Sequence, residues 1–256
     1  MLSVRRTRVL TALVDEHVLT TLPVGSSVLA KHYFPGVSSA TIRNELLGLE
    51  NLGLAFSPHT SAGRIPTNQG YRHFVNQLLL SPLALLAANT AFELSTVIDA
   101  SEAPGEATLS AQALETSLAS GHANMRQVLE LLSKSTGLLS LYFSQDEKMG
   151  LHVRGLSRLL TQPEFSESSR LLPLMALIEE QDDLIHMMES GMRTSDLSIL
   201  IGLESSGMLA NYTLLLRRGA DRSTIFGLLG PTRMEYRKAL AALESVAQYD
   251  FGQTRI

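Results

Sequence analysis

The stretch from Val37 to Arg64, VSSATIRNELLGLENLGLAFSPHTSAGR, limits the possible folds more than any other part of the chain. It predicts a short helix that begins at Ser38 or Ser39, because a serine hydroxyl can accept a hydrogen bond from a free amide of the first turn. The helix is predicted to end at Gly53. Apolar residues recur along one side at helical spacing, so that side can pack against a core. They are Ile42, Leu46 and Leu49, in line with Gly53 and beside Leu52.

The opposite side of this predicted helix is small and polar, and we expect no bulky apolar group on it. Such a side suits a helix that enters a DNA groove, because small residues allow close approach and Asn and Arg can bond to base edges or phosphates. For a lone helix of this kind, an outer face that is merely solvated is the ordinary alternative. The residues concerned are Ala40, Thr41, Asn44 and Asn51, with Arg43 and Glu45 on the flanks.

The neighbouring sequence favours the DNA-binding interpretation. Residues 3–19 repeat apolar side chains at helical spacing, and a short helix is predicted around residues 26–33, between two breaks that contain Pro and Gly. Helices joined by a turn that contains Gly make the helix-turn-helix pattern. A strand at residues 55–57 and a loop at residues 59–66 predict a hairpin after it, which would form a wing.

Two side chains of the central helix are the first candidates for DNA contact. Asn44 can form two hydrogen bonds with adenine in the major groove, and Arg43 can bind guanine or a phosphate. Alternatively, Arg43 pairs with Glu45 or Glu50, and Asn44 is simply solvated.

Three further groups of side chains are also candidate DNA contacts. The hydroxyls of Ser39 and Thr41 suit a phosphate at the start of the helix, although Ser39 could equally be only a cap. The predicted wing tip carries small residues and one Arg, which fit a narrow minor groove or a phosphate, or else form an ordinary solvated loop. These wing residues are His59, Thr60, Ser61 and Arg64, and Arg72 in the following helix could touch the DNA backbone.

Charge is divided unevenly along the chain. The net charge of the whole chain is −4 at pH 7. Residues 1–80 nevertheless carry seven Lys or Arg and four Asp or Glu, whereas the remainder carries 14 basic and 21 acidic residues. An N-terminal DNA-binding module attached to an acidic body is consistent with this division.

Composition and motifs exclude several classes of protein. With 45% hydrophobic and 18% charged residues, the composition is globular, and no apolar run is long enough to span a bilayer. The absence of Cys excludes disulfides and thiol chemistry and fits a cytoplasmic protein, and we see no signal peptide. No Walker loop, GxGxxG or HExxH is present, so we expect no enzyme and no cofactor. His186 and Glu189, one helical turn apart, could bind a metal, but a solvated helix face is favoured.

The second half of the chain predicts an α+β domain with a largely antiparallel sheet, because strands are flanked by helices in its order. Strands are predicted at residues 138–143, 151–155, 197–203, 209–217 and 223–229. Helices are predicted at residues 108–121, 122–134, 168–190 and 234–248.

Several long segments resemble the HrcA family, the heat-inducible transcription repressors of bacteria. They are PVGSSVLAKHY, VSSATIRNELLGLENLGL, HTSAGRIPTNQGYRHFV, GLSRLLTQPEF and GLLGPTRMEYRKAL. The resemblance covers most of residues 2–80 and returns at residues 155–165 and 225–243.

The resemblance implies an α+β fold with an N-terminal winged helix-turn-helix followed by a GAF-like α+β domain. The predicted domains are residues 1–80 for DNA binding, residues 81–107 as a helical connector and residues 108–256 as a GAF-like regulatory and dimerisation domain. HrcA proteins typically carry an inserted segment in the GAF-like domain that is associated with dimer contacts. Here YFSQDEKMG runs almost directly into LHVRGLSRLLTQPEF, so the insert is predicted to be reduced to a turn near residues 144–151.

The resemblance also implies a function. It is that of a repressor of heat-shock and chaperone operons that binds an inverted-repeat, CIRCE-type operator in double-stranded DNA as a homodimer, without membrane association. Temperature and the GroE chaperonin would modulate its activity. One alternative is a ligand-gated regulator that senses a small molecule through its GAF-like domain. Another is an adaptor protein that has lost operator binding, which the retained candidate DNA contacts disfavour.

Overall fold

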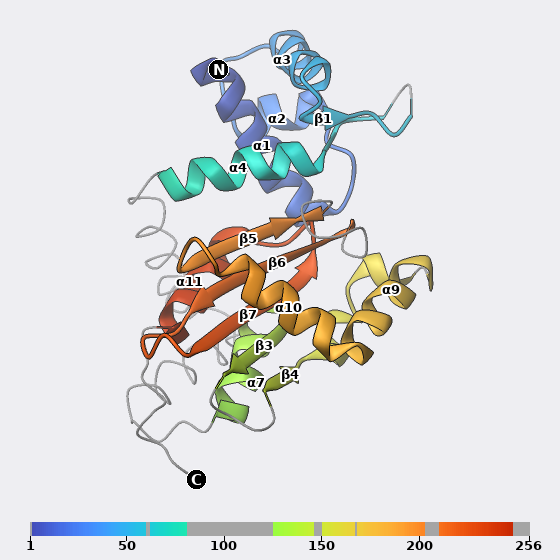
Figure 1. Ribbon diagram of the computed structural model, residues 1–256. Helices are drawn as coiled ribbons and strands as arrows, with labels where there is room; N and C mark the ends of the chain where they lie inside the picture. Colours follow the sequence, from blue (N-terminus) through green and yellow to red (C-terminus); the bar gives the residue numbers. More distant parts are fainter. Residues whose placement is uncertain are drawn as a thin grey trace, which may run out of the picture. The chain divides into compact units, whose positions relative to one another are not determined.

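The computed structural model describes residues 2–59, 62–80, 125–145, 150–166, 168–202 and 210–247 (Figure 1). Contacts divide the chain into two compact units, which are described separately here. The first consists of residues 1–82 with residues 232–234, and the second of residues 83–231 with residues 235–256. The predicted connector, the helix predicted at residues 108–121 and the wing residues Thr60 and Ser61 lie outside the described residues.

The first unit contains four helices and a small hairpin among its described residues. Its helices are α1 (Val4–Thr20), α2 (Ser26–His32), α3 (Ser39–Asn51) and α4 (Asn68–Leu80). The strands β1 (Ala55–Phe56) and β2 (Ile65–Pro66) pair antiparallel. The helices predicted around residues 3–19 and 26–33 and from Ser38 or Ser39 are therefore confirmed.

The core of the first unit forms where α1 meets α3. Val9, Leu10 and Leu13 of α1 are at most 1% exposed, and Ile42 and Leu49 of α3 are fully buried. The predicted end of α3 is confirmed, because Gly53 adopts a φ of 70° just past the last helical turn. A left-handed residue at this position closes a helix and is most easily supplied by Gly.

The second unit is built on a five-stranded antiparallel sheet with strand order β4-β3-β7-β6-β5. Its strands are β3 (Leu139–Ser144), β4 (Leu151–Arg154), β5 (Leu197–Ile201), β6 (Tyr212–Arg218) and β7 (Thr224–Pro231). The predicted antiparallel sheet is thus confirmed. In the turn between β6 and β7, the Asp221 carboxylate accepts hydrogen bonds from the amides of Ser223 and Thr224.

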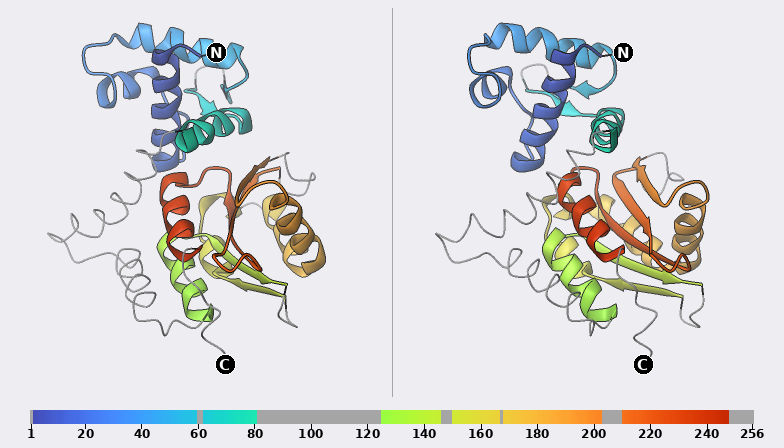
Figure 2. Two further views of the ribbon diagram at one scale, coloured as in Figure 1. Left: turned by 60° about the vertical axis from the view of Figure 1, so that its left-hand side comes forward. Right: turned by 90° about the vertical axis from the view of Figure 1, so that its left-hand side faces the viewer.

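Helices cover both faces of this sheet, as Figure 2 shows with α7 and α11 on one side and α10 on the other. Successive strand residues point to opposite faces. Leu214 and Leu216 therefore join the core cluster beneath α9 and α10. The helices are α7 (Met125–Thr136), α8 (Leu156–Leu159), α9 (Ser168–Glu179), α10 (Gln181–Gly191) and α11 (Tyr236–Ala247), with a 3-10 turn at Pro163–Ser166.

One element prediction for the second unit is wrong. Residues 168–190 were predicted as one helix, but the structure has two, separated at Glu180 with φ −85° and ψ 70°. The break lets both helices contribute to one core cluster, through Leu174 and Leu177 from α9 and Leu184 from α10. Packing on the sheet therefore overrides the continuous helical pattern of the sequence.

No helix in the described part of the chain is long and apolar enough to cross a membrane. Among the same residues, no group of three or more His, Asp or Glu side chains is placed to hold a metal ion.

Candidate nucleic-acid interface

The outer face of α3 is the centre of the candidate interface. Ile42, Leu46 and Leu49 are buried, and the opposite side of the helix faces outward. Ser39, Ala40, Arg43, Asn44, Leu47 and Asn51 are all exposed. Leu47 corrects one prediction: it follows Arg43 and Asn44 by one helical turn and is 48% exposed, so this face does carry a bulky apolar side chain.

Hydrogen bonds at the start of α3 identify its cap. The Ser38 hydroxyl accepts a hydrogen bond from the Thr41 amide at 3.1 Å, and the hydroxyls of Ser38 and Thr41 are 2.9 Å apart. Ser38 is therefore the cap, and the alternative that Ser39 serves only as a cap is wrong. Ser39 is exposed beside it, whereas Thr41 is half-buried and shares in the cap.

Arg43 and Asn44 are exposed, and neither side chain makes a hydrogen bond or an ion pair with another described residue. The two carboxylates predicted as alternative partners of Arg43 are bound by other arginines. Glu45 accepts from Arg6 at 3.0 Å, and Glu50 is 2.8 Å from the guanidinium of Arg64. The alternative in which Arg43 pairs with one of these glutamates is therefore wrong in this structure.

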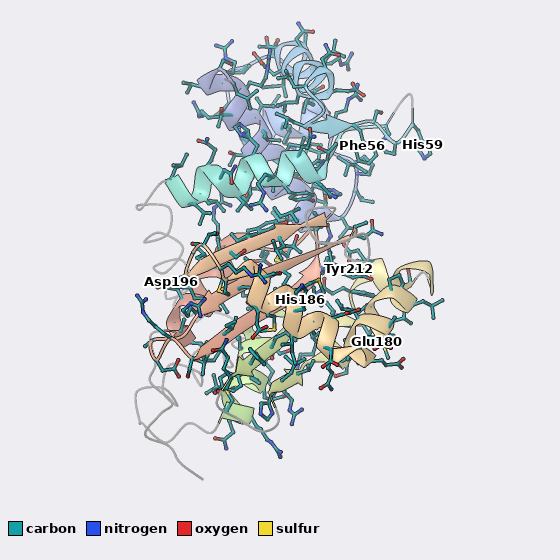
Figure 3. The ribbon with its side chains drawn as sticks, viewed as in Figure 1. Phe56, His59, Glu180, His186, Asp196 and Tyr212 are labelled. Atoms are coloured by element: carbon teal, nitrogen blue, oxygen red, sulfur yellow. The ribbon has the colours of Figure 1, made fainter. Side chains whose placement is uncertain are left out.

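The β1–β2 hairpin carries the candidate wing. Figure 3 shows Phe56 and His59 on the segment that extends away from the helices of the first unit. The backbone oxygen of His59 accepts hydrogen bonds from the Ser57 hydroxyl at 2.6 Å and from the Ala62 amide at 2.9 Å, while its side chain is exposed. Thr60 and Ser61 lie outside the described residues, so the structure places His59 and Arg64 of the four predicted wing residues.

Arg64 ties the hairpin to its surroundings. Its guanidinium binds Glu50 on α3 and also donates to the backbone oxygen of Ala62 at 3.3 Å. Its backbone forms a two-way bridge with Val24, with both N–H to O distances at 2.9 Å. Arg64 thus has a structural role in fixing the wing, and its predicted DNA contact would have to share the guanidinium with Glu50. Arg72, the remaining candidate, is half-buried on α4.

Two exposed arginines of α1 were not among the predicted contacts. Arg5 and Arg8 line an apolar hollow of about 330 Å³ together with Val4, Phe34, Val37 and Ile42. The guanidinium of Arg8 lies 5.6 Å from the centre of the Phe34 ring. The cluster RRTR is visible in the sequence. Which of its arginines faces α3 depends on packing between residues far apart in the chain, so the sequence alone does not show that Arg5 and Arg8 stay exposed.

Tyr33, at the end of α2, has a shifted pKa. Burial is the main cause, and a hydrogen bond from the phenol to the Glu16 carboxylate at 3.0 Å adds to it, so the pKa rises from 10.0 to about 12. A neutral phenol next to a carboxylate is favoured over a phenolate, because ionisation would place two negative charges together.

The class of protein follows from the fold and this surface: a two-unit α+β protein whose N-terminal helical unit presents an exposed, partly basic helix next to a hairpin. A family model described as the HrcA protein C terminal domain matches residues 91–240, more than half of the chain. The chain belongs to the HrcA family.

Its relatives include proteins named heat-inducible transcription repressor HrcA. That of Brevibacillus brevis is 27% identical over 338 aligned positions, covering 97% of this chain and 96% of the relative. That of Symbiobacterium thermophilum is also 27% identical and covers 97% of this chain and 98% of the relative. A crystal structure of a hypothetical protein shares the fold, with a TM-score of 0.69, 17% identity and coverage of 96% of this chain and 97% of that one.

Proposed function

We propose that this protein is a DNA-binding transcriptional repressor of heat-shock and chaperone genes that acts in the cytoplasm. The observation that carries the proposal is the outer face of α3, where Arg43 and Asn44 are exposed and unpaired while the neighbouring glutamates are bound by other arginines. The relatives' printed name, heat-inducible transcription repressor, supports the same function.

In this proposal residues 1–80 form a winged helix-turn-helix domain. The helix α3 enters the major groove, with Arg43 and Asn44 at base edges and Ser39 and Thr41 near phosphates. The β1–β2 hairpin is the wing, and its exposed residue His59 lies near the DNA with Thr60, Ser61 and Arg64. Arg72 of α4 is proposed to contact the DNA backbone. The hairpin position, directly after α3 and anchored to it through Glu50, supports this assignment.

The operator is proposed to be an inverted repeat of the CIRCE type, bound by a homodimer whose two-fold axis matches that of the DNA. Residues 108–256 would form a GAF-like domain that regulates activity and joins the protomers, and the GroE chaperonin would assist the active form. The family insert is proposed to be missing. Phe143 pairs with Leu151 across β3 and β4, and the alignment to the Brevibacillus relative extends over 338 positions, more than the 256 residues of this chain.

The test is a titration of the purified protein with a duplex carrying the CIRCE inverted repeat and with a scrambled duplex, at near-physiological salt. We expect tighter binding to the inverted repeat. Arg43→Ala and Asn44→Ala should each weaken that binding by about 1–3 kcal/mol and reduce the preference, because base-edge contacts discriminate by about this amount. Arg193→Ala and Asn76→Ala remove the same side chains from exposed positions outside α3 and should leave binding unchanged.

Equal, weak binding of both duplexes by folded protein would contradict the operator assignment unless added GroE chaperonin restores the preference. Preferential binding that the α3 substitutions do not alter would contradict the assignment of α3 as the base-reading helix, while the repressor function would stand.

A further inference from the structure

The first turns of α1 carry three arginines, whose guanidinium groups have different surroundings. Arg6 binds Glu45 at 3.0 Å and lies across Gly48, where an added Cβ would be only 2.7 Å from the guanidinium. The Arg6 guanidinium therefore links α1 to α3. Arg5 and Arg8 are exposed, and no carboxylate among the described residues forms an ion pair with either.

The position of Arg8 is fixed by an aromatic contact. Its guanidinium lies 5.6 Å from the centre of the Phe34 ring, within the range of a cation–π interaction. The ring is only 8% exposed, so it is itself held by packing. No hydrogen bond from the Arg8 guanidinium to another described residue is recorded, so its N–H donors are available to a further partner.

Arg5 and Arg8 border the apolar hollow lined by Val4, Phe34, Val37 and Ile42, and no acidic residue of the described part of the chain lines it. Phe34 and Val37 belong to the turn that precedes the Ser38 cap of α3, and Ile42 lies in the first turns of α3. The hollow therefore lies beside the end of α3 that the proposed function places in the major groove.

Three of the four acidic residues in residues 1–80 are bound to groups other than Arg5 and Arg8. Glu45 is bound to Arg6, Glu50 is bound to Arg64, and Glu16 accepts a hydrogen bond from Tyr33. An anion near the start of α3 would therefore meet two guanidinium groups that form no ion pair with a carboxylate of the described residues.

We propose that Arg5 and Arg8 bind the DNA backbone next to the groove that α3 enters. This inference rests on the proposed function. Guanidinium groups form strong, charge-assisted hydrogen bonds with phosphates. The chemistry of the hollow fits a nucleic-acid strand, in which charged phosphates alternate with apolar sugar carbons: the arginines take phosphates and the apolar floor takes the deoxyribose between them. Phosphate contacts fix register and carry no sequence information themselves.

The test compares Arg5→Gln and Arg8→Gln with the unchanged protein on the CIRCE duplex and on the scrambled duplex, over a series of salt concentrations. Each substitution should weaken binding to both duplexes roughly three- to tenfold at near-physiological salt. Each should also reduce the slope of log K against log salt by about one per protomer, because one fewer counterion is released. The ratio of the two affinities should stay nearly unchanged, in contrast to Arg43→Ala.

Two control variants separate binding from folding. Arg193→Gln removes an exposed charge from the second unit and should leave the salt slope unchanged. Arg6→Gln breaks the pair with Glu45 and should lower the melting temperature without lowering the slope.

An unchanged slope in both the Arg5 and Arg8 variants would overturn the inference, and a loss confined to the inverted repeat would overturn it in favour of a base contact. Neither result concerns the proposed function, whose operator assignment fails only if the unchanged protein shows no preference for the inverted repeat with or without added GroE chaperonin. In that event the salt slope on the scrambled duplex still decides whether the two arginines contact phosphates.

Discussion

At the scale of single residues, the start of α3 separates two adjacent serines by what their hydroxyls bind. The Ser38 hydroxyl accepts from the Thr41 amide, whereas no hydrogen bond from the Ser39 side chain is recorded among the described residues. An amide left without its cap must turn to water or stay unsatisfied, which weakens the first turn of a helix. Ser38 should therefore matter for folding and Ser39 for binding.

We expect Ser38→Ala to lower the free energy of unfolding of the first unit by about 1 kcal/mol, the usual cost of a lost cap. Ser39→Ala should change it by less than about 0.5 kcal/mol, as is normal for an exposed residue, and should weaken operator binding instead. Urea denaturation followed by circular dichroism, with the DNA titration alongside, measures both. Equal destabilisation by the two substitutions would show that the cap is shared between the serines.

The raised pKa of Tyr33 gives a prediction for alkaline pH. Because the pKa is higher in the folded state, the neutral phenol contributes stability that is fully present below pH 10 and is lost as the pH rises to about 12. The difference in unfolding free energy between the unchanged protein and Tyr33→Phe should shrink across this interval, as measured by urea denaturation at a series of pH values. A difference that stays constant from pH 10 upward would mean that neither burial nor Glu16 raises the pKa of this phenol.

At the scale of elements, the β1–β2 hairpin depends on attachments outside itself. Each strand has only two residues, too few for an isolated hairpin to be stable. The hairpin is held by the bridge between Val24 and Arg64 and by the hydrogen bond from the Thr67 hydroxyl to the Gly53 oxygen at 2.6 Å. Gly63 allows the chain to pass close to Val24, since an added Cβ would lie 2.4 Å from that residue's backbone.

Gly63→Ala should accordingly destabilise the first unit by about 1–3 kcal/mol, the usual cost of forcing atoms into a filled space, because the obstacle is backbone and not a flexible side chain. Gly25→Ala is the matched control. Its φ is −83° and the nearest atom to its Cβ would be 3.7 Å away, so we expect a change within about 0.5 kcal/mol. Melting curves of the two variants measure this difference in stability. Similar melting temperatures for Gly63→Ala and Gly25→Ala would mean that the loop shifts freely away from Val24.

Local sequence predicted most elements, because apolar periodicity and Pro or Gly breaks act over short distances. It predicted α1, α2, α3 and the strands of the sheet, but not the break at Glu180, which lacks a helix-breaking residue and serves packing. In the site, helical spacing placed Arg43 and Asn44 outward. Arg43 stays unpaired because Arg6 binds Glu45 and Arg64 binds Glu50. The partners in these two pairs are 39 and 14 residues apart, so no local pattern in the sequence reveals them.

At the scale of the whole molecule, each unit has its own core. In the proposed function the first unit binds DNA and the second joins the protomers, so a loss of packing in each core would impair a different step. In the second unit, Leu214 of β6 is fully buried in the cluster between the sheet and the helices α9 and α10. A domain of this size is stabilised by only about 5–15 kcal/mol, so a modest loss of core packing changes the temperature at which it unfolds. If the second unit joins the protomers, its unfolding removes the advantage of binding two half-sites at once.

We therefore expect Leu214→Ala, which should cost about 2–5 kcal/mol, to lower the melting temperature of the second unit by roughly 5–15 °C. The temperature at which half of the protein leaves the inverted-repeat duplex should fall in parallel. Leu172→Ala makes the same chemical change on α9 at a side chain that is 67% exposed, and should move neither temperature appreciably. Fluorescence anisotropy of labelled duplex during heating, beside circular dichroism of the protein, measures both quantities. A lower melting temperature with an unchanged release temperature would show that heat acts on the first unit directly, since DNA affinity would then survive the loss of the second core.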